Sequence, residues 1–246
     1  LAKSGARVIA LDLDPQNAMR LHFGIALQDA RGFITMLGAR PDWRSNLRPT
    51  SSGVSILAHG GVDLNTANQL SADLARTPAL LVEPIRQIAA EPDTWLIVDT
   101  APGPTPSLSA LLPMVNLLVV VLLVDSASTS LIPAIETGAA FGTGHQVPWG
   151  VALNQFDPRT RLGPLIADGA ARQLQKRLLG MIYRDESVVE AAAAQKLASD
   201  YAPAAKAAHD MAALTNEIFA RLAPPPPARA LREAPVRRGW LKALSA

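Results

Sequence analysis

The stretch "ARVIALDLDPQNAMRLHFG" (residues 6–24) joins a buried-strand pattern to two closely spaced carboxylates. The apolar run 8–11 ends in Asp12 and Asp14, and Pro15 follows at once. Ligands bind at the carboxyl ends of parallel strands, and residues i and i+2 of a strand point to the same side. Two crowded carboxylates repel each other unless a cation or hydrogen-bond donors lie between them. Two interpretations of this strand stay open: magnesium-dependent phosphoryl transfer, or simple capping of a helix that starts at Asp14-Pro15.

Length and composition exclude several classes of protein. The chain has 246 residues, of which 49% are hydrophobic, so one α/β domain with a substantial core is expected. Because the sequence has no cysteine, disulfides, zinc–thiolate sites and cysteine nucleophiles are excluded. The four histidines have no ligand spacing, which argues against a histidine metal site. The apolar run 117–124 is far short of the roughly 20 residues of a membrane helix, so a cytoplasmic protein is expected.

Short apolar runs alternate with helix-forming stretches along the chain. This alternation predicts an α/β fold with a doubly wound, mostly parallel sheet flanked by helices. Strands are expected at 8–11, 54–57, 95–98, 117–124 and 149–156, with 178–183 as a sixth candidate. Helices are expected at 79–90, 162–178, 186–201 and 203–222.

Two later apolar runs are also followed by a polar side chain, one by an aspartate and one by an asparagine. "TWLIVDTAPGP" (94–104) ends its apolar run in Asp99, followed by a loop rich in proline and glycine. This pattern fits the magnesium aspartate of a nucleotide hydrolase. In "GVALNQFDP" (150–158), Asn154 follows the apolar run of another strand, and its amide can pair with both a donor and an acceptor of an adenine ring. A simple turn asparagine before Asp157-Pro158 is an equally open interpretation.

Taken in order, the segments "LDLDPQN", "LIVDTAPG", "VALNQFD" and "IYRDESVVEA" resemble the ParA/MinD group of deviant Walker ATPases. The resemblance covers residues 1–222, and within the group "PDWRSNLRPTSSGVSILAHG" and the segment 183–211 are most similar to the BcsQ family of cellulose biosynthesis proteins. It implies a P-loop NTPase fold of the SIMIBI class, with ATP and Mg2+ as cofactors. It also implies a homodimer around ATP and, as partners, other proteins of the cellulose synthase operon.

The resemblance also implies a role for each matching residue. Asp14 would orient the attacking water, and Asp12 would support the magnesium and phosphate shell. Asp99 would be the metal-holding Walker B aspartate. The other three residues would lie near the nucleotide base. Asn154 would contact adenine, and Arg184 and Asp185 would lie near the base.

The family's phosphate loop is absent from these 246 residues, because "AKSG" (2–5) lacks the glycine spacing and opens no helix. We therefore expect an N-terminally truncated ATPase domain at 1–222, without its first strand and phosphate loop and inactive in this form. A basic, proline-rich tail (223–246) would follow it. The tail carries a net charge of +4, which leaves −2 for the body. Trp240 and Leu244 would share one face of a short tail helix, so the tail is expected either to contact the inner membrane peripherally or to be a solubilising extension.

Three functions remain open from the sequence. The first is an ATPase that supports bacterial cellulose biosynthesis and secretion by ATP-dependent dimerisation and organisation of the synthase complex. The second is a chromosome- or plasmid-partitioning ATPase, although the body charge of −2 makes DNA an unlikely partner. The third is a non-catalytic interaction module that keeps the fold without the chemistry.

Overall fold

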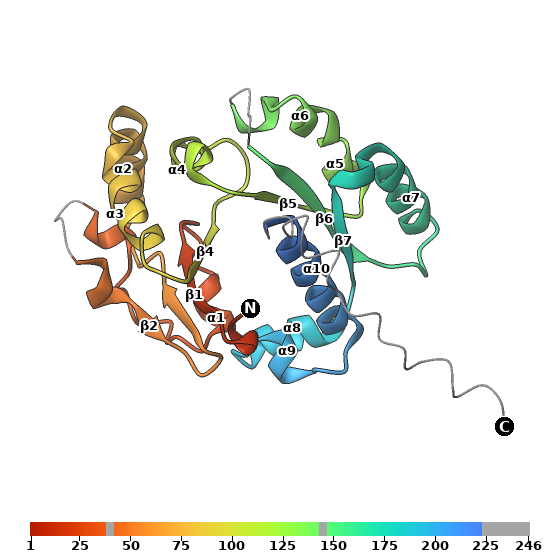
Figure 1. Ribbon diagram of the computed structural model, residues 1–246, viewed down its shortest axis with the longest axis horizontal. Coiled ribbons are helices and arrows are strands. Elements are labelled where there is room, and N and C mark those ends of the chain that lie inside the picture. Colours follow the sequence, from red (N-terminus) through yellow and green to blue (C-terminus); the bar gives the residue numbers. More distant parts are fainter. Residues whose placement is uncertain (38–41, 143–146, 223–246) are drawn as a thin grey trace, which may run out of the picture.

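The structure is a computed structural model that describes residues 1–37, 42–142 and 147–222. The expected basic tail, with its membrane contact, lies outside the described residues and stays a prediction. Two sheets lie side by side with helices around them (Figure 1). Within the described ranges, no helix combines the length and apolar composition that crossing a bilayer would require.

The first sheet contains the opening stretch of the chain. Its strand order is β2 (Arg48–Pro49), β3 (Val54–Leu57), β1 (Arg7–Asp12) and β4 (Thr94–Asp99). Strands β3, β1 and β4 are parallel, whereas β2 pairs antiparallel with β3. Strand β2 was not expected from the sequence, because it spans two residues and contains a proline, a residue confined to sheet edges.

The second sheet is fully parallel and has the order β5 (Leu118–Leu123), β6 (Trp149–Phe156) and β7 (Leu178–Tyr183). The predicted α/β class and all six predicted strands are confirmed. The strands form two sheets instead of one continuous sheet, because β4 pairs only with β1 and β5 only with β6 among the described residues.

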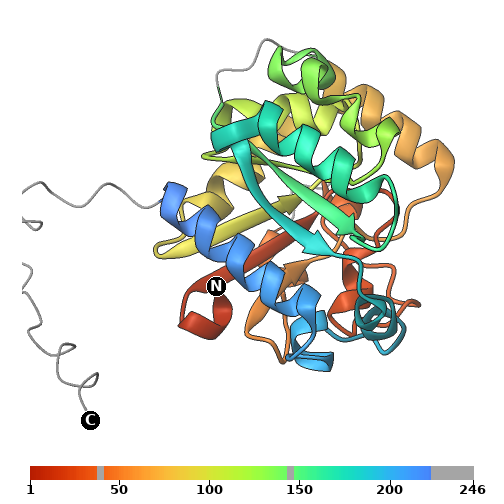
Figure 2. The same cartoon turned by 90° about the vertical axis from the view of Figure 1, so that its right-hand side faces the viewer.

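Helices surround both sheets. The α-helices are α1 (Met19–His22), α2 (Leu64–Arg76), α3 (Ala79–Ala89), α4 (Pro106–Leu111), α5 (Ser126–Thr129), α6 (Ile132–Glu136), α7 (Gly163–Leu174), α8 (Glu186–Ala193), α9 (Ala198–Tyr201) and α10 (Lys206–Leu222). Short 3-10 turns span Ala2–Ser4, Ile34–Met36, Trp43–Asn46, Leu112–Met114, Ala139–Phe141 and Gln175–Arg177. The helix expected over 186–201 is interrupted at Gln195, which has a left-handed φ of 53°. Helix α10 packs along β7, as Figure 2 shows.

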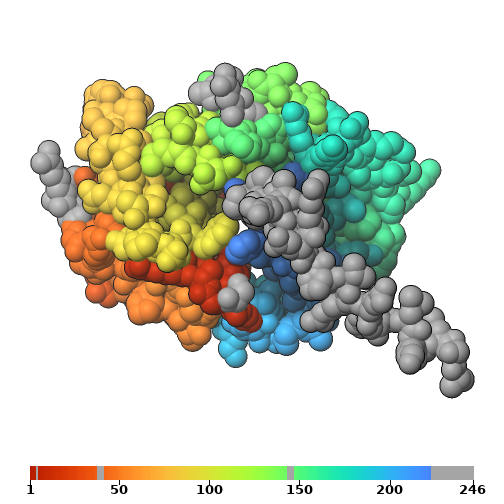
Figure 3. Space-filling view, in the orientation of Figure 1, coloured from red at the N-terminus to blue at the C-terminus, as the bar shows by residue number. Residues whose placement is uncertain are grey.

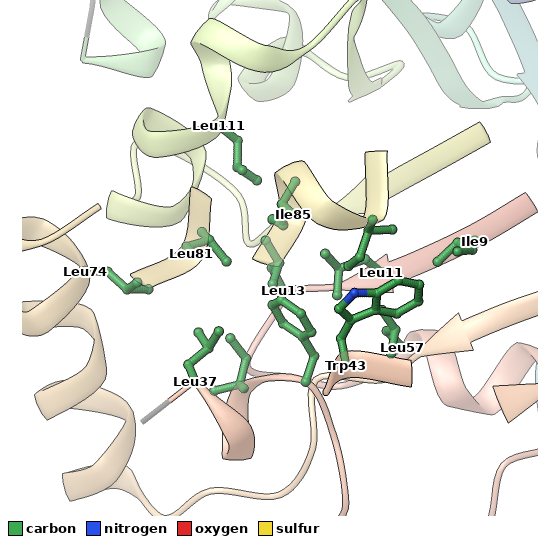
Figure 4. Close-up of a cluster of buried hydrophobic side chains, with 13 residues drawn as sticks. Ile9, Leu11, Leu13, Leu37, Trp43, Leu57, Leu74, Leu81, Ile85 and Leu111 are labelled. Atoms are coloured by element: carbon green, nitrogen blue, oxygen red, sulfur yellow. The ribbon is translucent and has the colours of Figure 1, made fainter. Parts of the chain in front are cut away.

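The core of the first sheet fixes the position of the opening stretch. Ile9 and Leu11 are fully buried in a first core cluster with Leu57 and with side chains of α2 and α3 (Figure 4). Ala10 faces a smaller cluster on the opposite side of the sheet. Because β1 is covered on both faces, its sequence reads as a continuous apolar run. The residue that follows Leu11, Asp12, is therefore held rigidly at the carboxyl end of the strand.

Candidate functional site

Asp12 is the last residue of β1 and is fully buried. Its Oδ1 accepts a hydrogen bond from the backbone N–H of Asp14 at 2.9 Å, and its Oδ2 accepts one from the N–H of Met19 at 3.2 Å. Burial raises the pKa of Asp12, and these two backbone hydrogen bonds partly oppose the rise. Met19 is the first residue of α1, whose N-cap residue is Ala18, so this helix does not start at Asp14-Pro15; Asp12 bonds to its first N–H from the end of β1. Asp12 thus fixes the turn that carries Asp14.

Asp99 lies beside Asp12 on the neighbouring strand. The two residues are partners in the β1–β4 ladder, and the N–H of Leu13 donates to the Asp99 carbonyl at 2.8 Å. Although Asp99 keeps an exposed surface, loss of hydration raises the pKa of its carboxyl, and the charge of Asp14 raises it further. Asp12, Asp14 and Asp99 therefore lie at the same end of the first sheet.

Three further polar residues at this edge were missed by the sequence analysis. His59 is buried just after β3, and its ring Nδ1 is 2.8 Å from the carbonyl oxygen of Gly60. His59 slightly lowers the pKa of Asp12, and His22 does the same for Asp99. Asn17 is buried with a left-handed φ of 51°, and among the described residues its Oδ1 has no hydrogen-bond partner. His59 follows the apolar run 54–57, and this position, like that of Asp12 after its own strand, could have identified it as a candidate site residue.

The second sheet ends in a bulge at the predicted base-binding asparagine. The Oδ1 of Asn154 accepts a hydrogen bond from the N–H of Gln155 at 2.9 Å. Gln155 has a φ of 57°, and the β6–β7 register shifts between Leu153 and Phe156. Bulges of this kind re-aim side chains at the ends of sheets, and left-handed non-glycine residues are enriched at functional sites.

Arg184 and Asp185 follow β7 at the same edge as Asn154. The N–H of Arg184 donates to the Phe156 carbonyl at 2.9 Å, which places Arg184 beside the end of β6. Asp185 caps α8, accepting hydrogen bonds from the N–H and the hydroxyl of Ser187 at 3.0 and 2.7 Å. Ser187 is the main cause of the lowered pKa of Asp185. The contacts of Asp185 are thus those of a helix cap, while the backbone of Arg184 lies beside Phe156, at the end of the strand that carries Asn154.

The structure brings the predicted residues together in two groups, one at the end of each sheet. The arrows of both sheets point to the same side of the molecule (Figure 2), so both groups lie at carboxyl ends. A pocket of about 550 Å³ lined by Gly5, Arg7, Glu91 and Trp95 lies at the opposite, amino ends of β1 and β4, away from all of these residues.

The carboxylates fit a magnesium ion that is shared with a phosphate ligand. Among the described residues, no three His, Asp or Glu side chains converge to form a complete metal cage. Magnesium is usually held by one or two carboxylates together with phosphate oxygens and water. Asp99, which keeps an exposed surface beside Asp14 at the end of β4, could supply such a carboxylate.

The raised pKa of Asp99 predicts a pH-dependent effect of Asp99→Asn on stability. A carboxyl whose pKa is higher in the folded than in the unfolded protein makes stability fall as pH rises through that folded value. Asp99→Asn should therefore raise the Tm of the ligand-free chain by about 1–3 °C at pH 7–8, a small shift because the group is partly solvated. The gain should vanish towards pH 3–4. Asp168→Asn on α7 is the control, and a gain that is independent of pH would contradict the prediction.

Comparison with known proteins identifies the family. Residues 1–219 match the family described as "Cellulose biosynthesis protein BcsQ". No curated protein sequence matches the chain.

Solved structures share the fold at low sequence identity. The cell division ATPase MinD of Pyrococcus furiosus is 21% identical, with a TM-score of 0.70, over 90% of this chain and 89% of that chain. MinD of Pyrococcus horikoshii OT3, complexed with Mg-ADP, is 18% identical, with a TM-score of 0.68 over 88% and 85%. A putative plasmid partition protein of Borrelia burgdorferi B31 bound to AMPPNP is 12% identical, with a TM-score of 0.69 over 89% and 88%. The chain has the ParA/MinD fold and belongs to the BcsQ family of cellulose biosynthesis proteins.

Proposed function

We propose that the protein is a ParA/MinD-like ATPase whose two sheet edges bind one Mg-ATP together. The observation that carries this proposal is the pairing of Asp12 with Asp99 across the β1–β4 ladder, with Asp14 held beside them by the Asp12 side chain. Burial is the main cause of the raised pKa values of Asp12 and Asp99, and repulsion from the neighbouring carboxylates adds to it, so a cation at this edge would stabilise the charged forms.

The residues at this edge would divide the work of ATP hydrolysis. Bound magnesium neutralises charge on the phosphates. Asp99 would hold that ion, and Asp12 would keep the turn after β1 in place through its two backbone hydrogen bonds. Asp14 would accept a hydrogen bond from the attacking water and so orient it towards the phosphate. Fixing the geometry of water and phosphate is the main contribution of a protein to phosphoryl transfer.

Residues near the carboxyl ends of β6 and β7 would bind the nucleotide base. Asn154 would read adenine, and the guanidinium of Arg184 would lie near the base. Asp185 would act on this edge indirectly, because its carboxylate caps the start of α8. It also accepts a hydrogen bond from the N–H of Ala207 at 3.3 Å.

The Asn154 assignment predicts a change in nucleotide preference. In a protein extended upstream to include a phosphate loop, Asn154→Ala should weaken ATP binding by about 1–3 kcal/mol, because hydrogen-bonding groups of the base lose their partner. GTP binding should weaken less. Titrations of both nucleotides measure the difference, with Asn68→Ala on α2 as the control. Equal losses for ATP and GTP would make Asn154 a turn residue.

Membership of the BcsQ family supports a role in cellulose secretion. We propose that ATP drives homodimerisation and that the dimer organises the cellulose synthase complex together with other proteins of that operon. Complementation of a strain that lacks the gene tests this role: the intact gene should restore cellulose output, and a gene carrying Asp14→Ala should not. Normal cellulose output in the deletion strain, accompanied by defective chromosome or plasmid segregation, would instead support a partitioning role.

A further inference from the structure

The loop between β6 and α7 carries a carboxylate that has no role in the site described above. Asp157 lies three residues after Asn154, and its side chain is only 14% exposed. Its backbone carbonyl accepts hydrogen bonds from the N–H and the hydroxyl of Thr160 at 3.3 and 2.9 Å. These two bonds close the turn that leads into α7. The backbone of Asp157 is therefore fixed at the carboxyl end of the second sheet.

Asp157 lies among the residues proposed to bind the base. It directly follows Phe156, the last residue of β6, and the bulge at Asn154 lies just before. The backbone N–H of Arg184 bonds to the Phe156 carbonyl at 2.9 Å, so the end of β7 meets the chain next to Asp157. The edge that carries Asn154 and Arg184 therefore also carries Asp157.

Arg159 occupies both oxygens of this carboxylate. Its Nε donates to Oδ1 of Asp157 and its Nη2 to Oδ2, each at 2.9 Å, and its backbone N–H also donates to Oδ1 at 3.0 Å. Two parallel bonds of this kind form the bidentate pair that arginine makes with carboxylates. The hydrogen bonds from Arg159 are the main cause of the low pKa of Asp157, about 2, and the charge of Arg184 lowers it further. Asp157 is therefore ionised near neutral pH, with both oxygens engaged.

One nucleotide base presents the same pair of parallel donors as an arginine. Guanine carries a ring N–H and an exocyclic amino group side by side, whereas adenine carries a ring acceptor beside its amino group. A carboxylate can therefore accept two parallel hydrogen bonds from guanine, but only one from adenine. A free Asp157 carboxylate at the base-binding edge would favour guanine. An Asp157 carboxylate that is already occupied by a guanidinium would not.

We propose that Arg159 sets the preference of the site for adenine over guanine by keeping both oxygens of Asp157 occupied. Arg159 acts through Asp157 and is a specificity-determining residue that need not touch the nucleotide. Its side chain is 82% exposed, so its removal should disturb packing little. The inference rests on the proposed function, because it places the base at the edge that carries Asn154.

The chain offers a matched control for this pair. Arg31 binds Asp29 across the same two-residue spacing, with its Nε 3.0 Å from Oδ1 and its Nη2 2.9 Å from Oδ2. The first sheet and its helices, in red to yellow, occupy the left half of the molecule in Figure 3, and α7, in teal, lies at the right. Arg31→Ala therefore removes the same kind of bidentate pair in the other half of the molecule.

The test compares ATP and GTP titrations of the protein extended upstream to include a phosphate loop. The unsubstituted protein should bind ATP more tightly than GTP, and in Arg159→Ala this preference should fall at least about tenfold, the discrimination that one bidentate pair with a base provides. Adding Asp157→Asn to Arg159→Ala should restore the preference to within about threefold of its original value, because an amide offers one donor and one acceptor to adenine. Arg31→Ala should leave the preference unchanged.

The outcomes separate this inference from the proposed function. The Tm of Arg159→Ala should stay within about 3 °C of the unsubstituted protein, because the pair is at the surface, so a changed preference would not come from unfolding. An unchanged preference in Arg159→Ala, an equal change in Arg31→Ala, or a gain of GTP binding that survives Asp157→Asn would overturn the inference and leave ATP binding intact. Absence of binding of both nucleotides by the unsubstituted extended protein would overturn the proposed function, and this inference with it.

Discussion

Replacing Asp14 by alanine in the upstream-extended protein should lower the rate of ATP hydrolysis about 10²- to 10⁴-fold, the usual contribution of a side chain that positions a reacting water or proton. Asp14 is half-buried in the turn after β1, where its Oδ1 accepts only a local hydrogen bond from the N–H of Gln16 at 2.8 Å. The Asp12 carboxylate stabilises this turn by accepting a hydrogen bond from the N–H of Asp14. ATP affinity should therefore change by less than about threefold, because Asp14 would act on the water and not on the nucleotide.

Steady-state phosphate release and an ATP titration separate these two effects. Asp42→Ala is the control, since Asp42 is an exposed aspartate that caps the 3-10 turn at Trp43. Asp42→Ala should leave turnover unchanged. A turnover rate of Asp14→Ala within threefold of the unsubstituted protein would remove Asp14 from the catalytic site.

The second large effect concerns the phosphate-binding loop. The 246 residues contain no glycine-rich segment with a lysine that could surround a polyphosphate, and Ala2–Ser4 form a short 3-10 turn that ends at Gly5. Most phosphate affinity in P-loop proteins comes from the backbone N–H groups of that loop and its lysine. The 246-residue chain should therefore release phosphate at the background rate, and extension upstream should raise the rate at least about tenfold.

Parallel assays of the two proteins, with EDTA as the magnesium-free control, measure this difference. Magnesium-dependent turnover by the 246-residue chain would contradict the requirement for the loop.

Local sequence was sufficient to predict the strands and the polar residues at their ends. Short apolar runs such as 149–156 become buried strands because helices cover both faces of the sheet, and this coverage leaves a continuous apolar signal. Asp12 and Asp99 could be placed at one edge because parallel strands share their carboxyl ends. These inferences needed only strand period and direction.

Features that depend on non-local contacts could not be predicted. The sequence does not reveal that, within the described residues, β4 pairs with β1 alone and β5 with β6 alone, because strand pairing is set by non-local contacts. The two backbone hydrogen bonds that Asp12 accepts could not be predicted, because they exist only once the turn to Met19 has formed. The resemblance implied that Asp185 lies near the nucleotide base. The sequence did not show that Asp185 accepts a hydrogen bond from Ser187 and caps a helix.

The central claim is that the aspartates of one sheet and Asn154 of the other belong to a single Mg-ATP site. Calorimetric titration of the extended protein with ATP in magnesium tests it most directly. One ATP per chain should bind, and both Asp99→Asn and Asn154→Ala should weaken binding at least about tenfold while the folded fraction is unchanged. Binding of ATP with unchanged affinity when magnesium is chelated, or in both substituted proteins, would contradict the claim.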